Sequence, residues 1–244
     1  MNMNKIKFIS NMPNLNENSI SYPTPANKNM PKWYLDADKF YKNDISNRLD
    51  IKNSGARIPT WKACPGLFDM FSAGYIFKTP CDLTFFINEK KEIDVRVEDP
   101  MYRGFCLRRD PLSQFTPPLG YYQFSFAWFS PWGIETPNGY SCIYMNPANR
   151  YDLPFLNTEG IIDTDKVSSP GSLPFYVLRG WTGTIPAGTP YLQILPFKRE
   201  DWKMELKNHS YQEILKRHQD QAALYRTKDG GQYKKFTWTR KKYE

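Results

Sequence analysis

The chain has 244 residues, of which 40% are hydrophobic and 16% aromatic, which is enough to bury at least one sizeable core. The formal net charge is +8, and the sequence has no run of 18 apolar residues, which excludes a membrane-spanning helix. We expect no secretory signal peptide, because the N-terminus lacks an apolar core. Four cysteines without a Cys-x-x-Cys pair and only two histidines argue against a zinc site, so we expect no metal and no cofactor.

Residues 1–57 are predicted to form an extended N-terminal arm. Pro23, Pro25 and Pro31 interrupt regular elements and favour extended backbone. The segment nevertheless has more aromatic residues than a disordered linker. We therefore expect aromatic side chains to anchor the arm on its own body or on a partner chain. These candidate assembly anchors are Trp33, Tyr34, Phe40 and Tyr41.

Residues 58–201 are predicted to form a mainly β body. The runs Leu83–Ile87 and Ile93–Val97 alternate in polarity around a polar turn, which is typical of a β-hairpin. Tyr121–Phe129 is a further predicted strand, with aromatic residues at every second position. Within Lys62–Tyr75, apolar residues occur at helical spacing, which predicts one or two helical turns.

Residues 202–244 are predicted to contain one helix followed by a tail. Ser210 precedes Glu213 by three residues, which is the spacing of a capping box at a helix start. The apolar residues that follow have helical spacing and predict one apolar face. We expect this helix to cover an edge of the β body or to contact a neighbouring subunit.

The last nineteen residues, 226–244, contain seven Lys and Arg residues against two Asp and Glu residues. Basic side chains bind phosphates and aromatic side chains stack on bases, so nucleic-acid binding is one hypothesis for this tail. The alternative is a solvated tail, or one docked on an acidic groove of a neighbouring subunit. The candidate nucleic-acid or partner contacts are Lys234, Lys235, Trp238, Arg240, Lys241 and Lys242.

Three pieces of the body occur in an informative order: a turn at Pro137–Gly139, the motif Gly160–Asp165, and a Gly188 turn before Pro190–Pro196. This order resembles the dUTPase and dCTP deaminase superfamily. The fold of that family is a β-clip, in which short strands form a distorted barrel. The resemblance therefore implies a mainly β, dUTPase-like distorted barrel, here with an extended N-terminal arm and one C-terminal helix.

The same resemblance implies that the active site is depleted. In the family, the aspartate corresponding to Asp163 positions the attacking water, but Lys166 stands where the base-stacking tyrosine belongs. Ile76 follows Ala73–Tyr75 at the place of a metal-binding carboxylate, and it offers no oxygen ligand. Ala148 replaces a phosphate-binding arginine. We therefore expect no catalytic residue.

If nucleotide binding is retained, the resemblance assigns it to Asp163, Gln193, Arg150 and Gly160. Asp163 and Asp165 allow two interpretations of their own. They could form a carboxylate pair or part of a metal-binding site, or they could be turn residues that bond local backbone amides.

A second resemblance rests on short sequences spread over residues 31–202. They are Pro31–Tyr34, Lys62–Pro65, Ser72–Tyr75, Pro131–Trp132, Thr136–Pro137, Gly160–Asp165 and Pro196–Glu200. Together they are similar to an uncharacterised family of tailed-bacteriophage proteins. The main hypothesis is a non-enzymatic phage protein that acts through protein–protein assembly as a virion structural component. Its partners would be copies of itself or virion neighbours, and its location the virion or the host cytoplasm. Nucleotide binding or hydrolysis is the first alternative, and nucleic-acid binding through the tail is the second.

Overall fold

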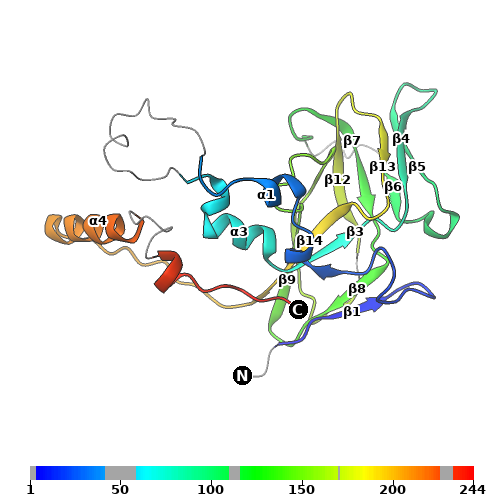
Figure 1. Cartoon of the computed structure of the whole chain (residues 1–244). Coiled ribbons are helices and arrows are strands. Elements are labelled where there is room, and N and C mark those ends of the chain that lie inside the picture. Colours follow the sequence, from blue (N-terminus) through cyan, green and yellow to red (C-terminus); the bar gives the residue numbers. More distant parts are fainter. Residues whose placement is uncertain (1–3, 42–58, 110–115, 170, 226–232) are drawn as a thin grey trace. The chain divides into compact units, whose positions relative to one another are not determined.

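The computed structural model describes residues 4–41, 59–109, 116–169, 171–225 and 233–244 (Figure 1). The chain divides into two compact units. Unit 1 comprises Met1–Asn29, Ala73–Arg199 and Tyr243–Glu244, and unit 2 comprises Met30–Ser72 and Glu200–Lys242. All described strands lie in unit 1, whereas unit 2 is helical.

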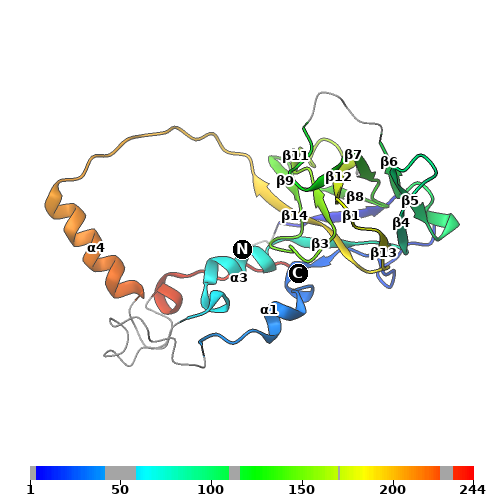
Figure 2. The same cartoon turned by 90° about the horizontal axis from the view of Figure 1, so that it is seen from above.

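Unit 1 confirms the prediction of a mainly β body, and its sheet pairings are antiparallel. Its strands are β1 (Lys7–Ser10), β2 (Thr24–Pro25), β3 (Tyr75–Lys78), β4 (Leu83–Ile87), β5 (Ile93–Val97), β6 (Cys106–Arg108), β7 (Tyr121–Trp128), β8 (Trp132–Glu135), β9 (Tyr140–Met145), β10 (Phe155–Asn157), β11 (Gly160–Ile162), β12 (Leu173–Leu178), β13 (Gly183–Ile185) and β14 (Pro190–Lys198). They form four sheets in the orders β1-β8, β10-β12-β7-β6, β11-β9-β14-β3-β2 and β13-β4-β5. A short 3-10 turn, η1 (Ala26–Lys28), follows β2, and a second, η3 (Pro100–Tyr102), connects β5 and β6. Figure 2 shows the same strands from above.

The predicted hairpin is present, since β4 pairs with β5 up to the Ile87–Ile93 pair. The side chain of Asn88 holds its turn by accepting hydrogen bonds from the Lys90 and Glu92 backbone N–H groups at 3.0 and 3.1 Å. These contacts are local, and local turn chemistry is what sequence patterns encode best.

Aromatic side chains form the centre of the unit 1 core. Trp128 on β7 stacks on Phe175 of β12, with ring centroids 3.8 Å apart. Phe155 and Tyr191 also pack against Trp128. The buried indole N–H donates to Asn157 Oδ1 at 2.9 Å, so the one polar atom of this tryptophan has a partner. On β7, Phe126 and Trp128 are buried in the core, and Tyr122 and Phe124 are partly buried against it.

The N-terminal segment differs from the predicted arm. β1 pairs with β8 and β2 pairs with β3, so residues 4–29 are part of the β unit. Ser21 is 1% exposed and accepts a hydrogen bond from the Trp132 indole at 3.2 Å. Proline-rich chain is extended, and extended chain can still pair at a sheet edge, which composition alone does not reveal. Residues 42–57 of the predicted arm lie outside the described residues.

Unit 2 contains α1 (Lys32–Asp36), η2 (Trp61–Ala63), α3 (Pro65–Ser72), α4 (Tyr211–Tyr225) and the π-helical turn η4 (Tyr233–Thr237). The helical turns predicted within Lys62–Tyr75 are therefore confirmed by α3. Tyr34 is buried, and its ring lies 4.4 Å from that of Phe71. Trp33 packs edge-on against the same ring at 5.6 Å.

The predicted C-terminal helix is α4, and its capping box is present. Ser210 N–H donates to Glu213 Oε2 at 2.8 Å, and Glu213 N–H donates to Ser210 Oγ at 3.4 Å. The expected apolar face is not covered, however, since Tyr211, Ile214 and Leu215 are 74%, 41% and 44% exposed. In the described part of the chain, no helix has the length and apolar character that crossing a bilayer requires.

Candidate functional site

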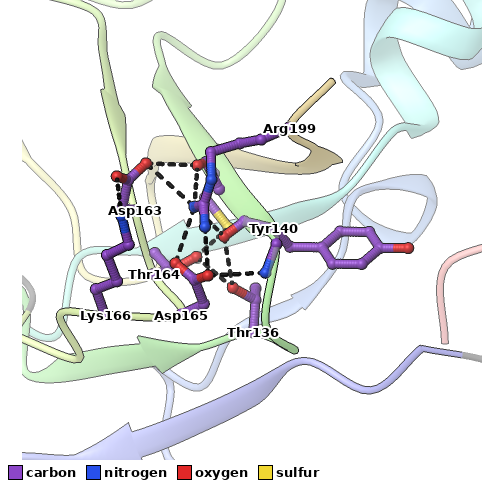
Figure 3. A network of polar contacts seen from close by, with 10 residues as sticks. Thr136, Tyr140, Asp163, Thr164, Asp165, Lys166 and Arg199 are labelled. Carbon is purple, nitrogen blue, oxygen red and sulfur yellow. Dashed lines mark hydrogen bonds and ion pairs between the residues drawn. The ribbon is translucent and has the colours of Figure 1, made fainter. Parts of the chain in front are cut away.

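A network of polar contacts in unit 1 surrounds Arg199, immediately after β14 (Figure 3). The pairing of β14 with β9 brings Lys198 opposite Tyr140, so Arg199 reaches the start of β9. Its backbone N–H donates to Gly139 O at 2.8 Å, and Nη1 donates to Tyr140 O and Ser141 Oγ at 2.9 and 2.8 Å. The guanidinium therefore fixes the turn that precedes β9.

Asp165 is the principal acidic partner of Arg199. The guanidinium binds both carboxylate oxygens, with Nη1 2.8 Å from Oδ1 and Nη2 bonded to Oδ2. Gly139 N–H donates to Oδ2 at 2.8 Å, and the side chain is 2% exposed. Hydrogen bonding from Arg199 lowers the pKa of Asp165 to about 2; burial opposes this shift and the Gly139 N–H bond adds to it.

Asp163 forms the outer part of the network. Its Oδ1 accepts a hydrogen bond from Ser141 Oγ at 2.7 Å and lies 3.2 Å from Arg199 Nη1. Lys166 Nζ lies 3.6 Å from Oδ2. The Ser141 hydrogen bond is the main reason why the pKa of Asp163 is lowered, and the charges of Arg199 and Lys166 add to it. A carboxylate with a lowered pKa is a weak general base.

A chain of hydroxyls lies beneath these carboxylates. Thr136 and Thr164 share a hydrogen bond of 2.7 Å, and Thr164 Oγ1 donates to Cys142 Sγ at 3.3 Å. Burial raises the pKa of the Cys142 thiol to about 11, so the thiol stays protonated at neutral pH and is a poor nucleophile.

We name the network of Arg199, Asp163, Asp165, Gly139 and Ser141 the arginine clamp. Its guanidinium is committed to acceptors of the same unit, and two carboxylates balance the positive charges of Arg199 and Lys166. A phosphate group would have to displace these carboxylates. The geometry therefore suits a structural role that joins the ends of β9, β11 and β14. The turn interpretation is wrong for Asp165, because its Oδ2 accepts a hydrogen bond from the distant Gly139 backbone N–H rather than from a local amide.

No family model matches this chain, and no curated protein matches it. The resemblance to the dUTPase superfamily and to the phage family therefore rests on the short motifs.

Two of the four candidate nucleotide-binding residues, Asp163 and Gln193, lie at different levels of the sheet. Asp163 follows Ile162, which pairs with Cys142 of β9, so Asp163 is level with Ser141. Ser141 pairs with Phe197 of β14, whereas Gln193 of the same strand pairs with Met145. Four residues of strand separate these levels, which is about 13 Å. The two side chains belong to one sheet but not to one site.

Gln193, Arg150 and Gly160 each have a local structural setting. Gln193 is 2% exposed; its Oε1 accepts from Ala148 N–H and its Nε2 donates to Ala73 O, both at 2.8 Å. Arg150 forms a bidentate ion pair with Asp152, with Nε–Oδ1 and Nη2–Oδ2 distances of 2.8 Å. Gly160 begins the edge strand β11.

Unit 1 also has an open hollow of about 930 Å³ beside the tip of the β4–β5 hairpin. Of its two cationic residues, Lys90 and Arg108, the latter donates to Glu92 at 2.7 Å and lies over the ring of Phe124 at 4.1 Å. The hollow has acidic, basic and apolar walls, and this mixture does not select one class of ligand. Among the described residues, no group of three or more His, Cys, Asp or Glu side chains could hold a metal ion.

In unit 2, three of the tail candidates dock on α3. Trp238 Nε1 and Lys241 Nζ donate to Asp69 Oδ2 at 2.9 and 2.7 Å, and Arg240 lies over the Phe68 ring at 5.3 Å. The carboxylate that receives the tail, Asp69, therefore belongs to the same chain. Lys234 and Lys235 lie in η4, and Lys242 is exposed.

The aromatic anchors likewise contact their own unit. Tyr34 and Trp33 pack on Phe71 of α3, and Phe40 bridges to Pro59. Tyr41 is 50% exposed. Three of the four anchors, Trp33, Tyr34 and Phe40, thus have contacts within their own unit.

Sequence reasoning missed Arg199, although it lies in the quoted Pro196–Glu200 sequence. One pattern could have found it. Asp163 and Asp165 are two carboxylates in one turn, and such a pair needs a nearby cation. An arginine directly after an adjacent strand meets that need, but the pairing of β14 with β9 must be known first.

Proposed function

We propose that this protein is a non-enzymatic subunit that works by protein–protein assembly. The observation that carries the proposal is the exposure of large apolar side chains between Trp202 and Leu215 of unit 2. Trp202, Met204 and Leu206 are 89%, 94% and 84% exposed, and the apolar residues of α4 follow directly.

Such exposure is costly for a protein that stays alone in water. Burying one of these side chains is worth roughly 1.5–3 kcal/mol. A 15-residue helix such as α4 is also marginal in water without a packed face. Contiguous exposed apolar surface marks an interaction site in soluble proteins. A partner that covers residues 202–215 would bury the exposed apolar side chains and would give α4 the packed face that it lacks.

The arginine clamp supports the absence of catalysis in this proposal. Its cations are neutralised by carboxylates, and its most accessible carboxylate has a lowered pKa. Gln193 and Arg150, two of the other nucleotide-site candidates, bond to groups of their own unit. The setting we propose is a bacteriophage particle, because of the resemblance to a phage family in the sequence.

We also infer that unit 1 is a β-clip related to the dUTPase superfamily. The inference is supported by the neighbourhood of three strands: the turn at Gly139 opens β9, Gly160 opens β11, and Gly188 precedes β14. These strands are adjacent in the order β11-β9-β14. The motifs in the expected order thus fall on one sheet.

Solution mass tests the assembly proposal. The triple variant Trp202→Ser, Met204→Ser, Leu206→Ser is expected to reduce the mass of the assembled protein, measured by sedimentation over a range of concentrations. The control replaces the exposed residues Leu119 and Tyr151 of unit 1 with serine and should leave the mass unchanged. A protein that remains monomeric at every concentration, without any added partner from a phage-infected cell, would contradict self-assembly.

A second candidate, nucleic-acid binding, is favoured by the distribution of charge. Unit 2 has eighteen Lys and Arg residues against eleven Asp and Glu residues, so it holds most of the +8 net charge. This candidate predicts binding of a fluorescent single-stranded oligonucleotide with an affinity that falls steeply as salt is raised. If no binding is detected at 50 mM salt, nucleic-acid binding is contradicted as a candidate function.

A further inference from the structure

We propose that Asp201–Lys207 pairs with the same segment of a second copy of this chain, as a two-fold symmetric antiparallel β-ribbon. The inference rests on the proposed assembly function and names its partner. The segment has the sequence DWKMELK and lies between β14 and α4, without regular secondary structure of its own (Figure 2).

Apolar and charged side chains alternate along residues 201–207. Trp202, Met204 and Leu206 are apolar, and the residues between and around them are charged. Alternation at every second position is the pattern of a strand with one apolar and one polar face. Every residue from 201 to 207 is exposed, so the strand pattern has no sheet to join within the described chain.

The sequence of residues 201–207 is complementary to its own copy when the two run antiparallel. In an antiparallel pair centred on Met204, each apolar residue lies opposite an apolar residue and each charge opposite its counter-charge. Asp201 faces the second copy's Lys207, Trp202 its Leu206, and Lys203 its Glu205, and two-fold symmetry repeats each of these pairs. Met204 faces its own copy on the axis. Directly opposed pairs of these kinds stabilise antiparallel strands. A two-fold axis through Met204 gives a closed dimer.

Other registers and a parallel pairing of the two segments would place like charges opposite each other. Moving the register by two residues preserves the two faces, but sets Lys203 opposite itself in one direction and Glu205 opposite itself in the other. A register shift by one residue mixes apolar with charged positions. A parallel, in-register pair sets every charge beside its own copy. The register centred on Met204 is therefore specified by both faces.

The apolar face of such a ribbon needs a cover, because two strands alone are marginal in water. The α4 helix begins four residues after Lys207 and belongs to the same unit. Its exposed Tyr211, Ile214 and Leu215 supply an apolar face for this purpose. The ribbon thus explains why both elements are left uncovered in a single chain.

A charge-exchange experiment on the full chain tests the register. Lys203→Glu sets two pairs of carboxylates opposite each other and should weaken the dimer about tenfold or more, measured as the dissociation constant by sedimentation equilibrium at low salt. The double variant Lys203→Glu/Glu205→Lys exchanges the partners and should restore the wild-type constant. Both positions are exposed, so neither change affects a buried core.

Cross-linking provides an independent readout in a Cys64→Ser background, which removes the exposed native thiol. Met204→Cys should form a disulfide-linked dimer, because directly opposite Cβ atoms are about 4.5–5.5 Å apart, close to disulfide geometry. Trp202→Cys or Leu206→Cys alone should not, since each lies about 13 Å from its own copy. A mixture of these two variants should cross-link.

The outcomes separate the two claims. Rescue by the double variant together with the Met204→Cys dimer supports the ribbon. An oligomer that is indifferent to Lys203→Glu and gives no Met204→Cys dimer overturns the ribbon and leaves the assembly function standing. A wild-type chain that stays monomeric at all concentrations overturns the ribbon and self-assembly together.

Discussion

Gly74→Ala is expected to destabilise unit 1 strongly, because β14 passes directly over this glycine. Gly74 has φ of +70°, and an added Cβ would lie 1.9 Å from Ile194 O and 3.2 Å from Leu195 Cα. These are backbone atoms of β14, so they cannot rotate away. The neighbouring Tyr75–Ile194 pair holds β3 and β14 together at this point.

The expected loss has two parts. A left-handed conformation costs a non-glycine residue roughly 1–2 kcal/mol, and forcing two packed strands apart costs roughly 1–3 kcal/mol more. The free energy of unfolding should therefore fall by about 2–5 kcal/mol. For a chain of this size each kcal/mol lowers Tm by about 2–4 °C, so Tm should fall by about 5–20 °C.

Gly120→Ala is the matched control for thermal unfolding followed by circular dichroism. Gly120 has φ of +87°, and a Cβ there would meet no atom within 4 Å. It should lose only the conformational part, about 1–2 kcal/mol. Equal losses in the two variants would refute the close approach of β14 to Gly74. This glycine also belongs to the Ala73–Tyr75 motif, so its presence has a structural reason independent of catalysis.

Three further predictions concern the clamp, the nucleotide site and the N-terminal segment. Because the pKa of folded Asp165 is about 2, below its ordinary value, the clamp stabilises unit 1 above about pH 4 and loses this effect as pH falls toward 2. In urea unfolding between pH 5 and 2, Asp165→Asn should make the free energy of unfolding depend less steeply on pH. An unchanged dependence would contradict the stabilising role of the Asp165 carboxylate. Adding dUTP or dCTP with magnesium should leave Tm unchanged; saturation at ~100 times Kd would add ~2.7 kcal/mol, so a rise of several degrees would revive the nucleotide hypothesis. Ser21→Ala should cost about 1–3 kcal/mol in denaturant unfolding, because the buried Trp132 N–H loses its acceptor, and no loss would argue that residues 4–29 are a detachable arm.

The sequence predicted best those features that depend on near neighbours. The β4–β5 hairpin rests on alternation and on the Asn88 turn, and the start of α4 rests on Ser210 and Glu213. Each of these contacts spans a few residues, so a pattern in the sequence contains most of the information needed.

Features that depend on strand register were not predictable in the same way. Arg199 meets Asp165 because β14 lies beside β9 and β9 beside β11, and no local pattern states that order. The same register separates Asp163 from Gln193, which the family motifs had suggested would act together. The role of Pro25 was misjudged for a related reason, since a two-residue edge strand leaves little trace in composition.

Hydrogen exchange of the wild-type chain, measured at low and at high protein concentration, tests the central claim most directly. We expect the backbone amides of residues 201–207 to exchange freely when the protein is dilute and to become protected as it associates. Protection that stays absent from this segment in a protein shown to be associated would contradict an assembly built on it.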